Sequence, residues 1–276
     1  MSFSASMQKT FPYYNTLISY TKIGMGLPVV LLHGFGEDST IWNTQVNFLK
    51  DHCQLIVPDL PGSGKSQMVN EEWSIEDFAD CIFSLLIHEN ISKCILMGHS
   101  MGGYITLAFA DKYPKMLKGF GLLHSTAFAD NKEKKQNRLK GISIIEEQGA
   151  YNFLKSTTPN LFGTSFKKNH PEKVEALIEQ GKQFSKETLQ QYYRAMRQRP
   201  DRTNVLQNTK LPVLFIMGEE DIAAPVKDVL QQVYLPEIAY IHILENVGHM
   251  GMQENEKQFT EYMLRFIQEA GNEFYQ

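Results

Sequence analysis

A short apolar run followed by a serine between two glycines most constrains the fold of this chain. Residues 94–97 have the composition of a buried strand, residues 98–102 read Gly-His-Ser-Met-Gly, and a helical pattern of apolar residues follows. A Gly-x-Ser-x-Gly turn between a strand and a helix predicts a serine on a sharp, strained turn, because only glycines let the two elements pack so closely. The free N–H groups and positive dipole end of that helix suit an oxyanion. Ser100 is therefore a candidate nucleophile.

Apolar runs alternate with helical patterns through the first half of the chain. Residues 29–32, 55–57 and 117–123 are mostly continuous apolar runs, typical of buried parallel strands, and residues 16–23 alternate loosely. Helical patterns lie between most of these runs. Strands that alternate with helices predict a parallel sheet with helices on its faces, so the expected fold class is α/β.

This alternation stops between residues 125 and 208. The segment contains helical patterns with apolar stripes and turns, but no convincing strand. The basic run from Lys132 to Lys140 is interpreted as a solvated helix face rather than an anion site. Helical patterns also cover about residues 226–233 and 254–269 near the end of the chain.

Two polar residues follow the two strand patterns that resume after this segment. Strands are expected at 212–217 and 239–244, with Asp221 just after the first and His249 after the second. The carboxyl ends of parallel strands meet at one edge of a sheet, so these side chains could meet Ser100 there. A serine hydroxyl needs a base, usually a histidine that a carboxylate holds in one tautomer. The three residues therefore form a candidate catalytic set.

Other acids and histidines compete for these roles. Glu219 and Glu220 stand beside Asp221 and remain alternatives for the carboxylate. His242 lies within a strand pattern, and His99 adjoins the serine but would point away across the turn. No grouping of histidines, cysteines and carboxylates has the spacing typical of metal ligands, so no metal is expected.

The composition of the chain limits the cellular compartments and the classes of partner that are expected for it. Of 276 residues, 42% are hydrophobic, enough for a sizeable core, and the formal net charge of −4 argues against nucleic acid as a partner. Residues 1–8 are polar and no apolar run reaches transmembrane length, so neither a signal peptide nor a membrane span is expected. Cys53, Cys81 and Cys94 are expected to be buried free thiols, which favours a cytoplasmic protein.

Five short motifs in a fixed order carry a resemblance to a known family. They are His33-Gly34-Phe35-Gly36, Asp59–Ser66, Gly98–Gly103, Gly218–Asp221 and Gly248-His249. Over nearly its whole length the chain resembles the α/β-hydrolase superfamily of serine hydrolases with a helical cap. The resemblance implies a mostly parallel central sheet of about eight strands with helices on both faces. It also implies a core domain of residues 1–124 and 209–276, with an inserted all-helical cap, or lid, of residues 125–208.

The resemblance further implies roles for individual residues. Ser100 would be the nucleophile, His249 the base, and Asp221 the acid, because it has the family's spacing from the preceding glycine. The backbone N–H groups of Phe35 and Met101 would form the oxyanion hole. No cofactor would be required.

The function that this resemblance favours is hydrolysis of a small to medium, fairly apolar carboxylic ester, or of a thioester or lactone, through an acyl-enzyme. Carbon–carbon bond hydrolysis and cofactor-free perhydrolysis on a similar triad stay open, as does a non-catalytic ligand-binding protein on this fold. The expected partner is a small ester-like molecule, and apolar stripes on the cap helices leave room for a homodimer. Candidate pocket residues, each with core packing or a structural role as its alternative, are Trp42, His124, Phe128, Phe162, Met196 and Met250.

Overall fold

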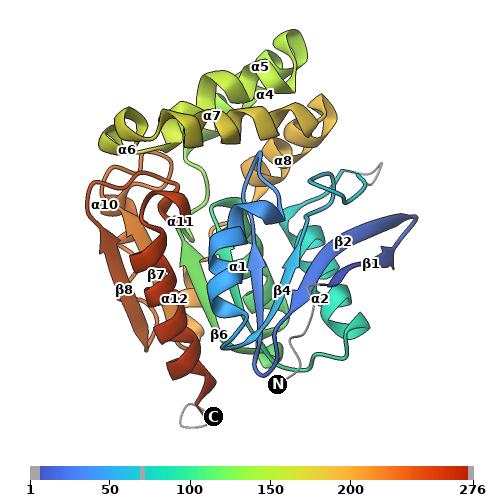
Figure 1. The fold of residues 1–276 in the computed structure, drawn as a ribbon, viewed down its shortest axis with the longest axis vertical. Helices are drawn as coiled ribbons and strands as arrows, with labels where there is room; N and C mark the ends of the chain where they lie inside the picture. The colour runs from blue at the N-terminus through green and yellow to red at the C-terminus, as the bar shows by residue number, and fades with distance from the viewer. Residues whose placement is uncertain (1–6, 69–71, 273–276) are drawn as a thin grey trace.

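The fold is built around one eight-stranded sheet, in a computed structural model that describes residues 7–68 and 72–272. From edge to edge the order is β1-β2-β4-β3-β5-β6-β7-β8 (Figure 1); β2 is antiparallel to both neighbours and the strands from β4 to β8 run parallel. The α/β class and the mostly parallel sheet are confirmed. The strands are β1 (Met7–Tyr13), β2 (Thr16–Ile23), β3 (Pro28–Leu32), β4 (Gln54–Pro58), β5 (Cys94–His99), β6 (Leu117–Leu123), β7 (Val213–Gly218) and β8 (Ala239–Leu244).

Helices cover both faces of this sheet because alternate strand residues enter two separate cores. In β3, Val30 and Leu32 pack in the core that includes α2 and α3, whereas Val29 and Leu31 pack in the core that includes α1 and α12. All four side chains are fully buried, which explains the continuous apolar run in the sequence. The core helices are α1 (Asn43–Leu49), α2 (Ile75–His88), α3 (Met101–Lys112), α10 (Val226–Val229), α11 (Gly251–Glu254) and α12 (Glu256–Gly271).

Two elements differ from the sequence-based prediction. Strand β1, which the sequence pattern does not predict, forms a hairpin with β2 through a tight turn at Tyr14, whose φ is 48°. As an edge strand β1 needs only one buried face, so its apolar pattern is short and it contains Pro12. The helix expected over about residues 226–233 ends at Val229. Beyond it the buried amide of Gln232 turns inward and accepts a hydrogen bond from the backbone N–H of Ala127.

Six helices occupy the segment between β6 and β7, and no strand interrupts residues 125–208. Figure 1 shows α4 to α8 gathered at one end of the sheet, at the top of the view. Helices α4, α5 and α8 share a small apolar core, which includes Ile145, Phe153 and Leu189, whereas α6 and α7 pack in the core that includes α1 and α12. The predicted helical content is confirmed, and the division into a core and a cap domain stays a prediction. The helices are α4 (Lys132–Gln148), α5 (Ala150–Thr157), α6 (Thr164–Asn169), α7 (Pro171–Gln180), α8 (Lys186–Gln198) and α9 (Thr203–Asn208), with 3-10 turns η3 (Thr158–Leu161) and η4 (Gly181–Gln183).

The basic run at the start of α4 is mostly a solvated helix face, as expected, since most of its lysines are exposed. Arg138 is the exception, because it forms an ion pair with Asp130, whose side chain is fully buried. Asp130 also pairs with Arg199 just after α8, at 2.9 Å. Burial by itself would raise the pKa of Asp130, but the guanidinium groups of Arg138 and Arg199 hold the pKa below its ordinary value. This ion-pair cluster ties α4 to the end of α8.

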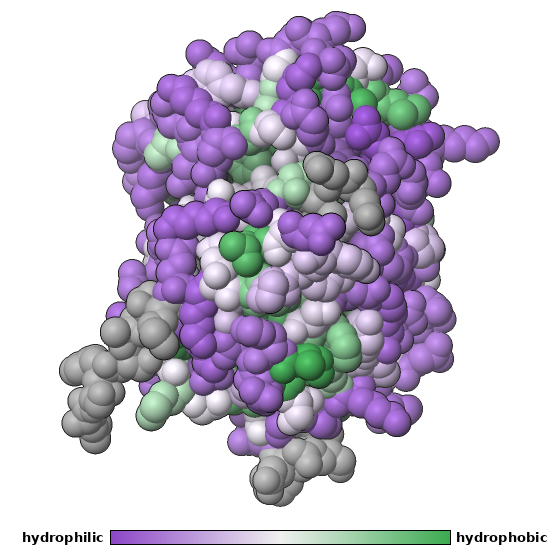
Figure 2. All heavy atoms as spheres, turned by 90° about the vertical axis from the view of Figure 1, so that its right-hand side faces the viewer, coloured by the Kyte–Doolittle hydropathy of each residue, from purple (hydrophilic) through white to green (hydrophobic). Residues whose placement is uncertain are grey.

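The described surface is mostly polar where Figure 2 shows it, and the three cysteines are buried free thiols, as expected. No helix within the described ranges combines the length and the apolar character that a bilayer crossing demands. The face seen from the right-hand side of Figure 1 is mostly hydrophilic and carries small, separate apolar spots (Figure 2). Cys53, Cys81 and Cys94 are free and buried, and burial raises the pKa of the Cys53 and Cys94 thiols to about 12.

Candidate active site

Ser100 stands on a strained turn between β5 and α3. Its φ of 52° and ψ of −115° lie outside the regions that most residues adopt. The flanking glycines are required by close contact: a Cβ added at Gly98 would lie 2.1 Å from the carbonyl carbon and oxygen of Gly102. A Cβ at Gly102 would lie 2.6 Å from the carbonyl oxygen of Leu32. The strand, turn and helix therefore have the geometry that the sequence predicts.

Replacement of Gly98 by alanine is expected to destabilise the fold by about 3 kcal/mol or more, because the added methyl group meets backbone atoms that cannot move aside. Denaturant unfolding measures the change. Gly149→Ala is the control without a clash: open space surrounds Gly149, so the added methyl group meets only the strain of its positive φ of 85° and is expected to cost only about 1 kcal/mol. Equal losses in the two variants would contradict the steric explanation.

Asp221 and His249 meet at the sheet edge, although 28 positions separate them in the chain. Asp221 follows β7, and its Oδ2 accepts a hydrogen bond of 2.8 Å from Nδ1 of His249, which follows β8. The other oxygen, Oδ1, accepts from the backbone N–H groups of Ala223 and Ala224 at 2.8 and 2.9 Å. Burial raises the pKa of Asp221, but His249, His124 and their hydrogen bonds hold it far below its ordinary value. The carboxylate is therefore ionised and fixed at both oxygens.

The loop that carries His249 is also fixed through its backbone. The N–H of His249 donates to the carbonyl of Leu161 in the helical segment at 2.6 Å, and its own carbonyl accepts from Nε2 of His99 at 2.9 Å. The Glu254 carboxylate accepts from the N–H groups of the two residues that flank His249, Gly248 and Met250. It also accepts from Gly163 at 2.8 Å. The sequence reasoning missed Glu254, since its partners are backbone groups that leave no side-chain pattern.

His99 points away from Ser100, as the sequence analysis expected. Both of its ring nitrogens face acceptors, because Nδ1 lies 2.9 Å from Oε2 of Glu37 and Nε2 contacts the carbonyl of His249. Glu37 is buried, and Oε2 also accepts from the N–H of Gly34 at 2.7 Å. Although burial raises the pKa of Glu37, its pairing with His99 lowers the pKa below the ordinary value. Glu37 thus connects the loop after β3 to the loop of His249, and sequence reasoning missed it too.

The loop after β3 presents the backbone N–H of Phe35 beside the start of α3. Among the described residues, neither this N–H nor that of Met101 donates a hydrogen bond, so both are free to bind an anion. A Cβ added at Gly34 would lie 3.1 Å from Cβ of Ser100, which shows how closely the loop approaches the serine. The Phe35 ring stacks on Tyr193 at a centroid distance of 4.3 Å. The assignment of these two N–H groups to an oxyanion hole stays a prediction.

The competing acids and histidines have other partners. Glu219 accepts from the N–H of Asn246, and Glu220 accepts from the N–H of Thr164. The ring of His242 stacks on Tyr262. Asp221 is the acid that contacts His249. Within the described part of the chain, however, no hydrogen bond joins Oγ of Ser100 to the His249 ring.

The six candidate pocket residues lie in three different environments. Trp42, Phe162, Met196 and Met250 are buried members of the apolar cores, which favours core packing for these four. His124 is 1% exposed, and its Nδ1 lies 3.1 Å from Oδ2 of Asp221. Phe128 lines a cavity and is described below.

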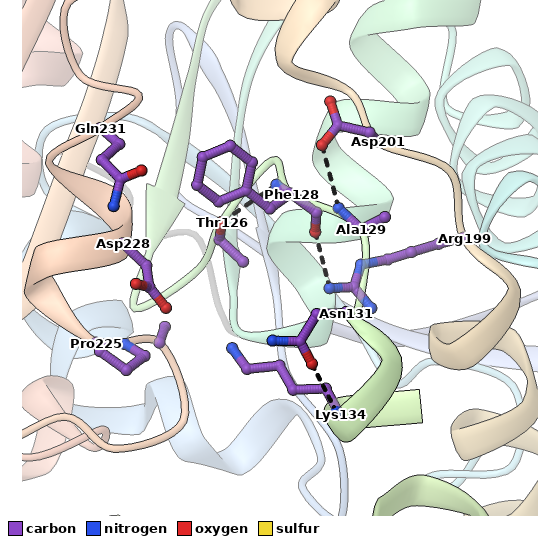
Figure 3. Close-up of a pocket in the computed structure, with 11 residues that line it drawn as sticks. Thr126, Phe128, Ala129, Asn131, Lys134, Arg199, Asp201, Pro225, Asp228 and Gln231 are labelled. Atoms are coloured by element: carbon purple, nitrogen blue, oxygen red, sulfur yellow. Dashed lines mark hydrogen bonds between the residues drawn. The ribbon is translucent and has the colours of Figure 1, made fainter. Parts of the chain in front are cut away.

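A cavity of about 280 Å³ lies beside the loop of Asp221 (Figure 3). Phe128 lines it together with Arg199, which donates to the carbonyl of Phe128 at 3.0 Å. Ala224 and Pro225, from the loop after Asp221, also line it, and most of the other lining residues are polar or charged, such as Asn131, Lys134 and Asp228. Ser100, Asp221 and His249 are not among its lining residues. The cavity is therefore a neighbour of the candidate site and not part of it.

One cluster within the described residues brings possible metal ligands together. Single ligand atoms of His124, Asp221 and His249 lie within 4.8 Å of one another. Each imidazole uses its Nδ1 to donate to the same carboxylate oxygen, so each Nδ1 carries a proton. A metal would need the lone pair instead, and hydrogen bonding alone accounts for the cluster.

Comparison with known proteins assigns the family. The profile described as "alpha/beta hydrolase fold" matches residues 28–256. Pimeloyl-[acyl-carrier protein] methyl ester esterase of Wigglesworthia glossinidia brevipalpis is 30% identical over 211 residues, 74% of this chain and 79% of that protein. The dihydrolipoyllysine-residue acetyltransferase component of the acetoin cleaving system of Pseudomonas putida is 28% identical over 246 residues, 88% of this chain, and the chain spans 64% of that protein's length.

A solved structure supports the same assignment over the whole fold. The thermophilic esterase from Thermogutta terrifontis (malate bound) superposes with a TM-score of 0.90 at 28% identity, covering 98% of this chain and 100% of that one. The profile, the relatives and the solved structure agree with the α/β fold described above. The chain belongs to the alpha/beta hydrolase fold family.

Proposed function

We propose that this protein is a serine hydrolase that cleaves small to medium carboxylic esters through an acyl-enzyme on Ser100. The observation that carries the proposal is the 2.8 Å hydrogen bond that holds Nδ1 of His249 on Asp221. It leaves Nε2 of the imidazole as the acceptor for a proton from a nearby hydroxyl, the arrangement that a serine nucleophile requires. Two of the similar proteins described above are esterases, which favours this substrate class.

The proposed reaction has two stages. Ser100 attacks the ester carbonyl while Nε2 of His249 takes the hydroxyl proton, and the N–H groups of Phe35 and Met101 bind the oxyanion. His249 then protonates the leaving alcohol, and a water molecule activated by the same imidazole releases the acid. Catalytic hydrogen bonds are often long without substrate, so we place the Ser100–His249 hydrogen bond in the substrate complex.

Aromatic side chains beside the free N–H groups support an apolar acyl or alcohol group. The half-buried ring of Phe35 stacks on Tyr193, and both rings contact Phe153 edge-on. These rings form an apolar wall next to the proposed oxyanion hole. An aromatic surface of this kind favours uncharged hydrocarbon groups over charged ones.

A panel of aryl esters graded by acyl length, extended with lactones and thioesters, tests the substrate class. We expect saturable hydrolysis of the esters with an optimum at short to medium acyl chains. A fluorophosphonate probe should label the wild-type protein at Ser100, which peptide mass spectrometry locates. Absence of both turnover and labelling would contradict the proposal and favour a ligand-binding role, whereas labelling with turnover of lactones or thioesters alone would change only the substrate class.

The pH dependence of kcat/KM follows from the environment of His249. Burial lowers the pKa of His249, but the charge of Asp221 and its hydrogen bond outweigh burial and raise the pKa above the ordinary 6.5. Only the neutral imidazole can accept a proton, so activity is lost as the pH falls through this raised pKa. We expect the acid limb for a neutral aryl ester to have its midpoint above pH 6.5. A midpoint below that value would show that Asp221 does not govern the base.

A further inference from the structure

Two imidazole groups share one oxygen of Asp221. Oδ2 accepts from Nδ1 of His249 at 2.8 Å and from Nδ1 of His124 at 3.1 Å. Because the carboxylate is ionised and cannot donate, both Nδ1 atoms carry protons. The pair proposed above, Asp221 and His249, therefore has a third member with the same type of contact. The side chains of His124 and Asp221 are fully buried, and that of His249 is 5% exposed.

The fold holds the His124 ring in a single orientation. His124 is the first residue after β6, its φ is 50°, and its N–H donates to the carbonyl of Ile216 in β7 at 2.8 Å. The ring stacks almost parallel on Phe259, at a centroid distance of 6.1 Å and an angle of 7°. Gly251 leaves room for the ring, because a Cβ there would lie 2.4 Å from Nε2. The ring is thus packed in place and aimed at Asp221.

The chemistry of the ring follows from this packing. Nε2 of His124 is buried and has no hydrogen-bond partner among the described residues. A proton on Nε2 would leave an unpaired buried donor and a buried charge, so the neutral tautomer with its proton on Nδ1 is favoured. Burial accordingly lowers the pKa of His124 to about 4, although the hydrogen bond to Asp221 opposes the shift. His124 is a permanent neutral donor at neutral pH.

We propose that His124 is a positioning residue, whose Nδ1–H orients the Asp221 carboxylate toward His249 and takes up part of the negative charge on Oδ2. This inference rests on the proposed function, in which His249 is the base. A shared oxygen attracts the proton of His249 less strongly than an unshared one, because its lone pairs and charge are divided between two donors. His124 thereby limits how strongly Asp221 stabilises the protonated base and keeps His249 available at neutral pH.

Other charged or titratable groups face His249 from the remaining elements and stay in place when His124 changes. Glu37 and His99 lie on the side of β3 and β5, and Glu254 lies on α11. Glu37 and Glu254 both favour the protonated form of His249. When the His124 donor is removed, Glu37 and Glu254 still favour the protonated form of His249. We therefore expect the pKa of His249 to shift in one direction only, upward.

Two substitutions of His124 by side chains of the same shape distinguish a positioning role from a packing role. The side-chain nitrogen of asparagine takes the place of Nδ1, so His124→Asn keeps a donor to Asp221, whereas His124→Leu has the same shape without one. In His124→Leu the acid limb of kcat/KM is expected to move up by about 0.5–1 pH unit, with roughly tenfold lower plateau activity. In His124→Asn the acid limb of kcat/KM is expected to stay near its wild-type position. Phe259→Leu, which removes only the stacking partner, should lower stability without moving the limb.

A substrate-free measurement keeps this test independent of the proposed function. The titration of His249 is followed by NMR in the wild-type protein and both His124 variants, with circular dichroism to show that each is folded. A higher pKa of His249 in His124→Leu than in His124→Asn supports positioning, even if no ester is hydrolysed. The same pKa in all three proteins, or equal shifts in the two variants, would overturn the inference and leave His124 a packing residue.

Discussion

Replacing Ser100 with alanine is expected to lower kcat for an aryl ester by roughly a millionfold while leaving the protein folded. The reason is that the hydroxyl is the only atom of Ser100 that the proposed reaction uses, and no neighbouring group can form the acyl-enzyme in its place. The backbone strain at φ 52° is the same for serine and alanine, so the melting temperature should change by less than about 2 °C. Steady-state kinetics and thermal unfolding measure the two effects.

Ser125 provides a matched control for the loss of a hydroxyl at the same place. Its Oγ donates to the carbonyl of Ser100 at 2.8 Å, so Ser125→Ala disturbs the turn without removing the nucleophile. We expect this variant to lose less than about tenfold in kcat, the effect of one hydrogen bond. If Ser100→Ala kept more than about one hundredth of the wild-type rate, the acyl-enzyme mechanism would be wrong.

The second large effect is expected for Asp221→Asn, at about 10⁴-fold in kcat. Oδ1 of the residue accepts from two backbone N–H groups, so the amide oxygen of asparagine takes that position and its NH₂ group faces the imidazoles. A donor now meets Nδ1 of His249, which favours the tautomer with its proton on Nε2. In that tautomer Nε2 cannot accept the proton of Ser100. Single-turnover kinetics measure the loss at the chemical step.

Two neighbouring carboxylates are the controls for Asp221. Glu219 and Glu220 bind backbone N–H groups of Asn246 and Thr164, respectively, and neither contacts His249. Glu219→Gln and Glu220→Gln are expected to stay within about tenfold of the wild-type kcat. A loss in either variant as large as that in Asp221→Asn would assign the acid role to the wrong residue. The pH profile of Asp221→Asn is a second test. Without the charge of Asp221, burial lowers the pKa of His249, so the acid limb of kcat/KM should move to lower pH.

Much of the fold was predictable because its signals are local. Continuous apolar runs such as residues 29–32 and 94–97 predict strands buried on both faces, and Gly98 reflects a contact with Gly102, only four residues away. Asp221 and His249 were found for the same reason, since each follows the end of a strand and parallel strands end at a common edge. Strand β1 left no such signal, because an edge strand with one buried face can remain largely polar.

Which side chains support the site was decided only by the tertiary structure. Glu37, Glu254 and His124 each form a hydrogen bond with a residue from a distant part of the chain, and nothing next to them in the sequence marks these partners, which are His99, Gly163 and Asp221, respectively. The same holds for Trp42 and Met250, whose apolar character predicts burial but not whether they face a core or a cleft. Sequence periodicity determines which residues are withdrawn from water, whereas the neighbours that each one meets there depend on how the whole chain packs.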